Sequence, residues 1–158
     1  MRKGWRVKPR EATWHYITIR AVGYDDDRLF SDREREKLRE ILMAHCVYLT
    51  VEIAAYNMTN NEMQIVLNDP APDIPDEEVC LRYARYYPER PNVLPGTPEC
   101  DAVRAKITDM SNFMRTILST FTRWYNRTCS WKSRGTLWIT PYKNTVMEEG
   151  MVLPEGLI

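Results

Sequence analysis

The chain lacks the features that would place it in a membrane or direct it out of the cell. None of its apolar runs approaches the roughly 18 residues that a membrane-spanning helix needs, so we predict no membrane segment. Its basic first residues are not followed by the apolar core of a secretory signal peptide. We therefore expect a cytoplasmic protein.

The chain also lacks the cysteine spacing of a structural zinc site or of a disulfide framework. There is no Cys-X-X-Cys pair, and the four cysteines lie far apart. Free thiols in a reducing compartment are the expectation. These cysteines are Cys46, Cys80, Cys100 and Cys129.

What the chain does contain is sufficient for one folded domain. Its 158 residues fit a single domain, and 44% hydrophobic residues with five tryptophans can form a core. This composition argues against disorder. We predict one domain over residues 1–158. Most of the prolines fall within residues 69–100, which we interpret as an insertion or long connection inside that domain.

Charge is balanced in total but uneven along the chain. Residues 1–20 hold six basic residues and one acidic residue, and residues 102–143 hold eight and one. If the two segments share a face of the folded domain, that face would suit the phosphates of nucleic acid. The alternative is that these are ordinary solvated charges.

Residue patterns predict the order strand, helix, strand, strand, helix, strand. The first helix begins at a capping box, Ser31 with Glu34, and extends to about Cys46. A long helix with one apolar face is predicted over residues 102–126, and a short helix over residues 76–87. The expected strands cover residues 13–22, 47–56, 61–68, 137–139 and 145–147. This order is that of a ferredoxin-like (RRM-like) α+β fold, an antiparallel sheet with helices packed on one face.

Two polar residues alternate on the strand expected over residues 61–68. Glu62 and Gln64 are two positions apart, so their side chains share one face of the strand. Carboxylate and amide oxygens suit Mg²⁺ or Mn²⁺, which makes this pair a candidate metal site. The alternative is a polar strand surface that faces solvent.

Residues 55–67 resemble the metal-binding strand of the HUH single-strand DNA transposases. In that family the strand runs Tyr-Cys-X-Met-X-Asn-His-X-His and then aliphatic residues. Asn61 and the aliphatic residues match, whereas Glu62 and Gln64 stand where the family has its two histidines. Further segments are similar, in the same order, to the branch that includes the REP-associated tyrosine transposases. They are residues 14–20, 28–30, 110–115, 121–127, 135–138 and 142–148.

The resemblance implies the HUH transposase fold and a partner, single-stranded or hairpin DNA, commonly bound by a homodimer. In the family, two histidines hold a divalent metal that polarises the scissile phosphate, and a tyrosine attacks it. Here both histidines are replaced, and the family's tyrosine helix is not found before Ile158. Reduced or absent catalysis is therefore expected. Tyr125 is a weak substitute nucleophile, because it falls on the apolar face of the long helix.

Basic and aromatic residues toward the carboxyl terminus are the expected DNA contacts. Lysine and arginine would bind phosphates whatever the sequence, and Trp131 in a basic turn would stack on an unpaired base. The predicted set is Arg20, Arg123, Arg127, Trp131, Lys132, Arg134 and Lys143.

Three functions follow from these observations. The favoured one is a transposase-like DNA-binding domain with little or no strand transfer. The second is an active metal-dependent transposase or nuclease that uses Glu62 and Gln64 as ligands. The third is a repurposed protein-interaction domain that docks through residues 70–98, for which the neutral net charge is the best support.

Overall fold

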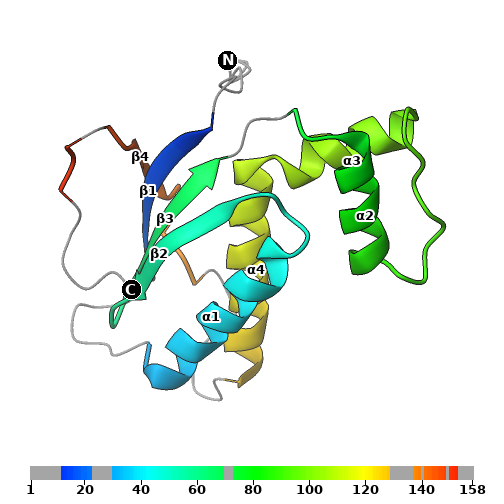
Figure 1. Cartoon of the computed structure of the whole chain (residues 1–158). Coiled ribbons are helices and arrows are strands. Elements are labelled where there is room, and N and C mark those ends of the chain that lie inside the picture. The colour runs from blue at the N-terminus through cyan, green and yellow to red at the C-terminus, as the bar shows by residue number, and fades with distance from the viewer. Residues whose placement is uncertain are drawn as a thin grey trace, which may run out of the picture.

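The computed structural model describes residues 12–22, 30–69, 73–128, 137–139, 141–148 and 150–152. These residues form an α+β sandwich of one antiparallel sheet and helices, as the sequence predicts (Figure 1). The elements are β1 (Thr13–Arg20), α1 (Asp32–Cys46), β2 (Glu52–Met58), β3 (Glu62–Asp69), α2 (Asp76–Tyr86), α3 (Pro98–Ile107), α4 (Met110–Thr128) and β4 (Lys143–Val146).

The four strands lie in the order β2-β3-β1-β4, and every neighbouring pair is antiparallel. This is the strand order of a ferredoxin-like fold, so the predicted fold class is confirmed. The central pair, β1 and β3, is in register from Thr13 opposite Asp69 to Arg20 opposite Glu62. An irregularity between Ile53 and Ala55 shifts the pairing of β2 with β3.

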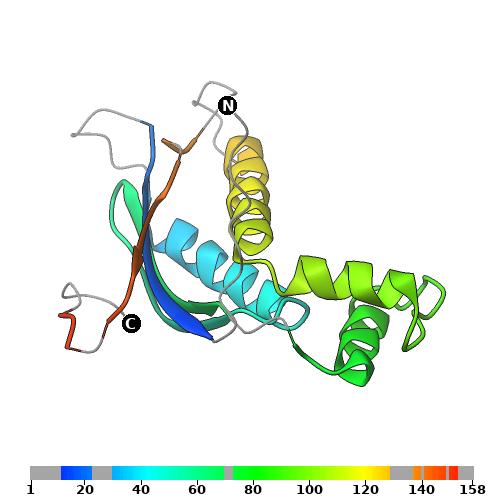
Figure 2. The same ribbon diagram turned by 90° about the horizontal axis from the view of Figure 1, so that it is seen from above.

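Helices α1 and α4 cover one face of the sheet (Figure 2). Alternation along β1 directs Ile17 and Ile19 into the core, whereas Trp14 and Arg20 are exposed. Among the described residues no helix covers the opposite face (Figure 2). Any ligand of the sheet itself would therefore meet its strands on that open face.

Helix α1 begins at the predicted capping box. The Ser31 backbone N–H donates to Glu34 Oε2 at 2.7 Å, and the Ser31 side chain accepts from the backbone at the third helical position. Burial alone would raise the pKa of Glu34, but the hydrogen bonds from Ser31 outweigh it and the pKa is lowered. The first helix is thus fixed by local chemistry that the sequence displays.

The long helix predicted over residues 102–126 is interrupted. Helix α3 ends at Ile107 and α4 begins at Met110, because Asp109 Oδ1 accepts the backbone N–H of Ser111 at 2.9 Å and so caps α4. Strand β2 likewise starts later than predicted: the Leu49 N–H bonds to His45 O at 2.8 Å, which continues the turn after α1.

Helices α2 and α3 pack against each other as a hairpin that extends away from the sheet (Figure 1). Helix α2 confirms the short helix predicted within the proline-rich segment. Buried Val79, Cys100 and Ile107 join the same core as the sheet residues.

Cys46, Cys80 and Cys100 are free thiols, and Cys129 lies outside the described residues. In the described part of the chain, none of the helices is both long and apolar enough to cross a membrane.

Candidate nucleic-acid interface

The predicted metal ligands lie side by side on the open face of the sheet. Strand β3 places Glu62 opposite Arg20 and Gln64 opposite Thr18 of β1. The Gln64 Nε2 amide donates to Glu62 Oε1 at 2.8 Å, and Arg20 Nε lies 4.0 Å from Glu62 Oε2. The carboxylate is thus already engaged by an amide and a guanidinium.

This arrangement fits a divalent cation poorly. A cation at this place would meet one carboxylate beside the positive charge of Arg20, and the Gln64 amide presents its N–H group to Glu62 rather than its oxygen. The Gln64 oxygen faces Asn57 Nδ2 at 3.4 Å. The described residues contain no cluster of three or more His, Cys, Asp or Glu that would complete a site. We therefore derive no chemical step through a metal.

Neither His15 nor Tyr16 completes a catalytic centre with this pair. His15 faces the helix-covered side, where its Nδ1 lies 2.8 Å from Asn144 Oδ1 and donates to it. Tyr16 shares the open face with Glu62, a position that sequence patterns did not single out. Burial, and then the negative charge of Glu62, raise the pKa of Tyr16. The neutral phenol is therefore favoured over the nucleophilic phenolate.

Two of the predicted DNA contacts meet Glu62 at a small recess. Arg20 and Lys143 line it together with Ile139 and Pro141, and its volume is about 100 Å³. We call this the sheet-edge recess. It is smaller than the roughly 300–1,000 Å³ of most ligand pockets, so it can receive a charged group at the surface but not a whole nucleotide.

A larger hollow, the α4 groove, lies between helix α4 and the segment that leads into β4. Its volume is about 750 Å³. Helix α4 directs its apolar residues, such as Phe113 and Phe121, into the core and leaves the opposite face to the groove. The lining is Ser111, Arg115, Leu118, Ser119, Thr122, Arg123, Leu137, Trp138, Pro141 and Tyr142. Hydroxyl, guanidinium and aromatic groups thus share one concave surface.

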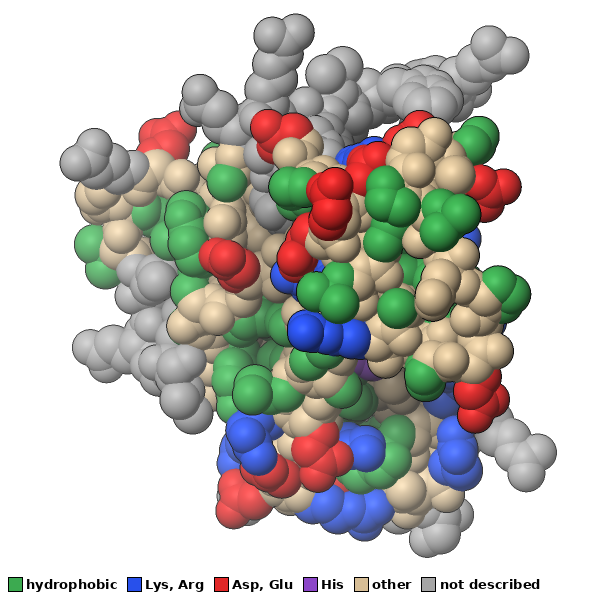
Figure 3. All heavy atoms as spheres, turned by 45° about the vertical axis from the view of Figure 1, so that its right-hand side comes forward, with side chains coloured by type: hydrophobic (Ala, Val, Ile, Leu, Met, Phe, Trp, Pro, Cys, Tyr) green, Lys and Arg blue, Asp and Glu red, His purple; other side chains and the backbone are tan. Residues whose placement is uncertain are grey.

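The arginines of α4 differ from the basic residues of α1 in their partners. Arg115, Arg123 and Arg127 are exposed, and none forms an ion pair with any residue that the structure describes. On α1, by contrast, Arg39 pairs with Glu36 at 2.8 Å, and acidic and basic side chains are interspersed at the lower end of Figure 3. The positive charge of α4 is therefore available to an external anion.

Other predicted residues are buried or lie outside the described part of the chain. Tyr125 is 1% exposed, and its ring packs edge-on against Phe30 at 5.8 Å. Tyr125 therefore packs in the core and is not accessible as a nucleophile. Predicted contacts Trp131, Lys132 and Arg134 fall among residues that the structure does not describe.

Arg115 also lines a second hollow, separate from the α4 groove, which sequence patterns did not predict. It has a volume of about 520 Å³ between the α2–α3 hairpin and helices α1 and α4. We call it the tyrosine cleft, after Tyr48, Tyr83, Tyr86 and Tyr87 in its lining. The tyrosines among residues 83–87 are a signal that the sequence displays. The sequence does not show which residues of α1 and α4 lie opposite them.

The structure is similar to a solved structure of a REP-associated tyrosine transposase bound to a REP hairpin, with a TM-score of 0.52 and 14% sequence identity. The match covers 94% of this chain and 63% of that chain. No family model and no curated protein matches the sequence. At this identity the likeness shows the fold alone, and it agrees with the predicted α+β fold.

Proposed function

We propose that this protein binds hairpin or single-stranded DNA through the α4 groove and the adjoining sheet-edge recess. The observation that carries the proposal is the set of exposed α4 arginines without carboxylate partners among the described residues, beside a groove of about 750 Å³. The fold adds support, because the similar transposase structure has a REP hairpin bound.

The two hollows adjoin each other and offer positions for successive phosphates of a DNA backbone. Pro141 lines both of them, so the groove and the recess at the sheet edge meet at this residue. Arg115 and Arg123 are eight residues apart on α4, which separates their Cα atoms by about 12 Å along the helix axis. Lys143 and Arg20 continue the basic track beyond Pro141. Such contacts bind the backbone whatever the base sequence.

The proposal includes DNA binding but little or no strand transfer by the described residues. The Glu62 carboxylate is engaged by Gln64 and Arg20, Tyr16 is held as the neutral phenol, and Tyr125 is buried in the core. The homodimer and the cytoplasmic location that we expect from the sequence go with this function and stay predictions.

The test is fluorescence anisotropy with a labelled DNA hairpin that carries a single-stranded 5′ extension, titrated between about 50 and 200 mM salt. The wild type should bind, and its affinity should fall steeply with salt because counterions are released. In the double variant Arg115→Ala/Arg123→Ala, each lost phosphate contact should remove about 0.7–0.9 from the slope of log K against log salt. The expected loss is therefore about 1.4–1.8.

A matched control removes the same charge elsewhere. Arg39→Ala/Arg85→Ala also lowers the net charge by two, at exposed positions on α1 and α2 that line neither hollow. Its salt slope should equal that of the wild type. Absence of wild-type binding at low salt refutes the proposal, and equal slopes for the two double variants would show that DNA does not follow α4.

A further inference from the structure

The tyrosine cleft combines flat aromatic surfaces with positive charge. The rings of Tyr48 and Tyr86 are stacked, with centroids 4.3 Å apart and an interplanar angle of 13°. Tyr87 stands perpendicular to Tyr86, with centroids 4.7 Å apart, and the Arg90 guanidinium lies 4.0 Å from the centre of the Tyr87 ring. Tyr86 is 40% exposed, so a ligand can reach part of this stack.

The charged groups of the cleft are all basic. Arg90, Lys106 and Arg115 line it, and no carboxylate of a described residue does. None of the three forms an ion pair within the described part of the chain. In Figure 3, hydrophobic and basic side chains lie where the α2–α3 hairpin, above, meets the helices below it. An anion would thus be attracted to the same hollow that offers the aromatic rings.

His45 adds a hydrogen-bond acceptor to the same lining. Its Nδ1 lies 2.8 Å from the carbonyl oxygen of Ile41, and because a carbonyl can only accept, Nδ1 carries the proton. In the neutral ring Nε2 is then an acceptor, which suits the amino or imino N–H of a nucleobase. Asn112 and Thr116 add polar groups from α4.

We infer that the tyrosine cleft holds one unpaired nucleotide of the bound DNA, with its base against the tyrosines and its phosphate against Lys106 and Arg115. The cleft volume of about 520 Å³ is within the usual range of ligand sites. Aromatic stacking with nearby cations is how proteins bind single-stranded nucleic acid. The inference rests on the proposed function, which it extends to a site on the other side of Arg115.

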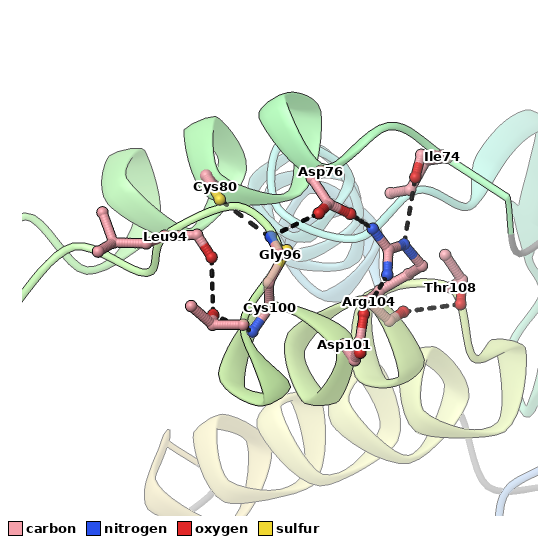
Figure 4. A network of polar contacts seen from close by, with 10 residues as sticks. Ile74, Asp76, Cys80, Leu94, Gly96, Cys100, Asp101, Arg104 and Thr108 are labelled. Carbon is pink, nitrogen blue, oxygen red and sulfur yellow. Dashed lines mark hydrogen bonds and ion pairs between the residues drawn. The ribbon is translucent and has the colours of Figure 1, made fainter.

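The position of Arg115 connects the two sites. It lines the α4 groove and also the tyrosine cleft, so a backbone that follows the groove can deliver its next nucleotide to the cleft. Helix α3, which supplies Lys106, is fixed relative to α2 by the Arg104 guanidinium, which contacts Asp76, Asp101 and the carbonyl of Ile74 (Figure 4). These contacts fix the position of the helix from which Lys106 extends to the cleft.

The test uses the full chain, the hairpin with its 5′ extension, the same hairpin with a blunt end, and 2-aminopurine at single positions of the extension. On binding to the wild type, 2-aminopurine fluorescence at one position should be quenched by stacking. Tyr86→Ala should abolish that quenching and weaken binding of the extended hairpin by about 5-fold to 100-fold, while the blunt hairpin binds as before. Tyr86→Phe keeps the ring and should bind and quench like the wild type.

A second variant keeps the inference testable if Tyr86→Ala is poorly folded. Lys106→Ala, at an exposed position of α3, should weaken the extended hairpin but not the blunt one. Unchanged affinity and quenching in both variants, with the wild type still binding and Arg115→Ala/Arg123→Ala still impaired, overturns this inference alone. A wild type that binds neither hairpin overturns the proposed function as well. Deoxyadenosine monophosphate binding as tightly as the extended hairpin would overturn the assignment to a DNA strand in favour of a free nucleotide.

Discussion

Arg104→Ala should loosen the packing of α2 against α3 in the α2–α3 hairpin. The Arg104 guanidinium lies between the two helices, where it contacts Asp76 Oδ1, donates to Ile74 O at 3.1 Å and donates to Asp101 Oδ1 at 2.8 Å (Figure 4). Asp76 in turn accepts the backbone N–H of Gly96 at 2.8 Å. Arg104 and Asp76 together thus join the start of α2, the loop before α3 and α3 itself.

The expected loss follows from how far these groups are buried. The side chains of Arg104 and Asp76 are 20% and 30% exposed, so their attraction is only partly screened. Hydrogen bonds to charged groups contribute about 1.5–3 kcal/mol, and the Ile74 carbonyl loses its donor as well. The contact with Asp101, which is 74% exposed, adds little. We expect a loss of about 2–3 kcal/mol in the free energy of unfolding.

Thermal and urea unfolding followed by circular dichroism would measure this loss. For a chain of this length, about 2–3 kcal/mol corresponds to a fall in melting temperature of about 5–10 °C. Arg39→Ala, which breaks an exposed ion pair on α1, is the control and should change the melting temperature far less. The reasoning is refuted if the two variants are equally stable. Hydrogen exchange should locate the loosening in α2 and α3.

Two further predictions concern ionisation and metal binding. Burial, and then Tyr87, Tyr83 and Tyr86, raise the pKa of Tyr48 from 10.0 to about 12. The stability that this shift contributes is full below pH 10.0 and is lost as the pH rises toward about 12. Absorbance at 295 nm should therefore show a late-ionising tyrosine that Tyr48→Phe removes, and an unchanged titration would contradict the half-buried position of Tyr48 among the other tyrosines. Calorimetry with Mn²⁺ should show no binding tighter than about 1 mM. Binding that Glu62→Ala abolishes would instead establish a metal site.

Local signals in the sequence were sufficient for most of the fold. The capping box at Ser31 and the alternation in β1 and β3 depend on neighbouring residues, and these elements were predicted within a few positions. The interruption between α3 and α4 was missed because apolar residues keep their helical spacing across it. The side chain of Asp109 accepts the capping hydrogen bond that separates the two helices. The spacing of apolar residues along the sequence gives no sign of such a bond.

The candidate site required tertiary information that no local pattern contains. Glu62 and Gln64 were correctly placed on one face, but the register with β1 determines that Arg20 lies beside the carboxylate. The basic character of α4 was visible in the sequence. That no carboxylate in the described part of the chain pairs with its exposed arginines depends on packing.

The tyrosine cleft would give the proposed DNA binding a route that does not depend on a metal-binding strand. Tyr48 comes from the turn after α1, Tyr86 and Tyr87 from the end of α2, and Arg115 from α4. These residues meet only because the α2–α3 hairpin, whose two helices Arg104 holds together, packs beside α4. If the cleft holds a nucleotide, its binding and the salt-dependent contacts of α4 are coupled through Arg115. The variants Arg104→Ala and Tyr86→Ala should then weaken the extended hairpin without affecting the blunt one, because both act on the cleft and neither removes a phosphate contact of the α4 groove.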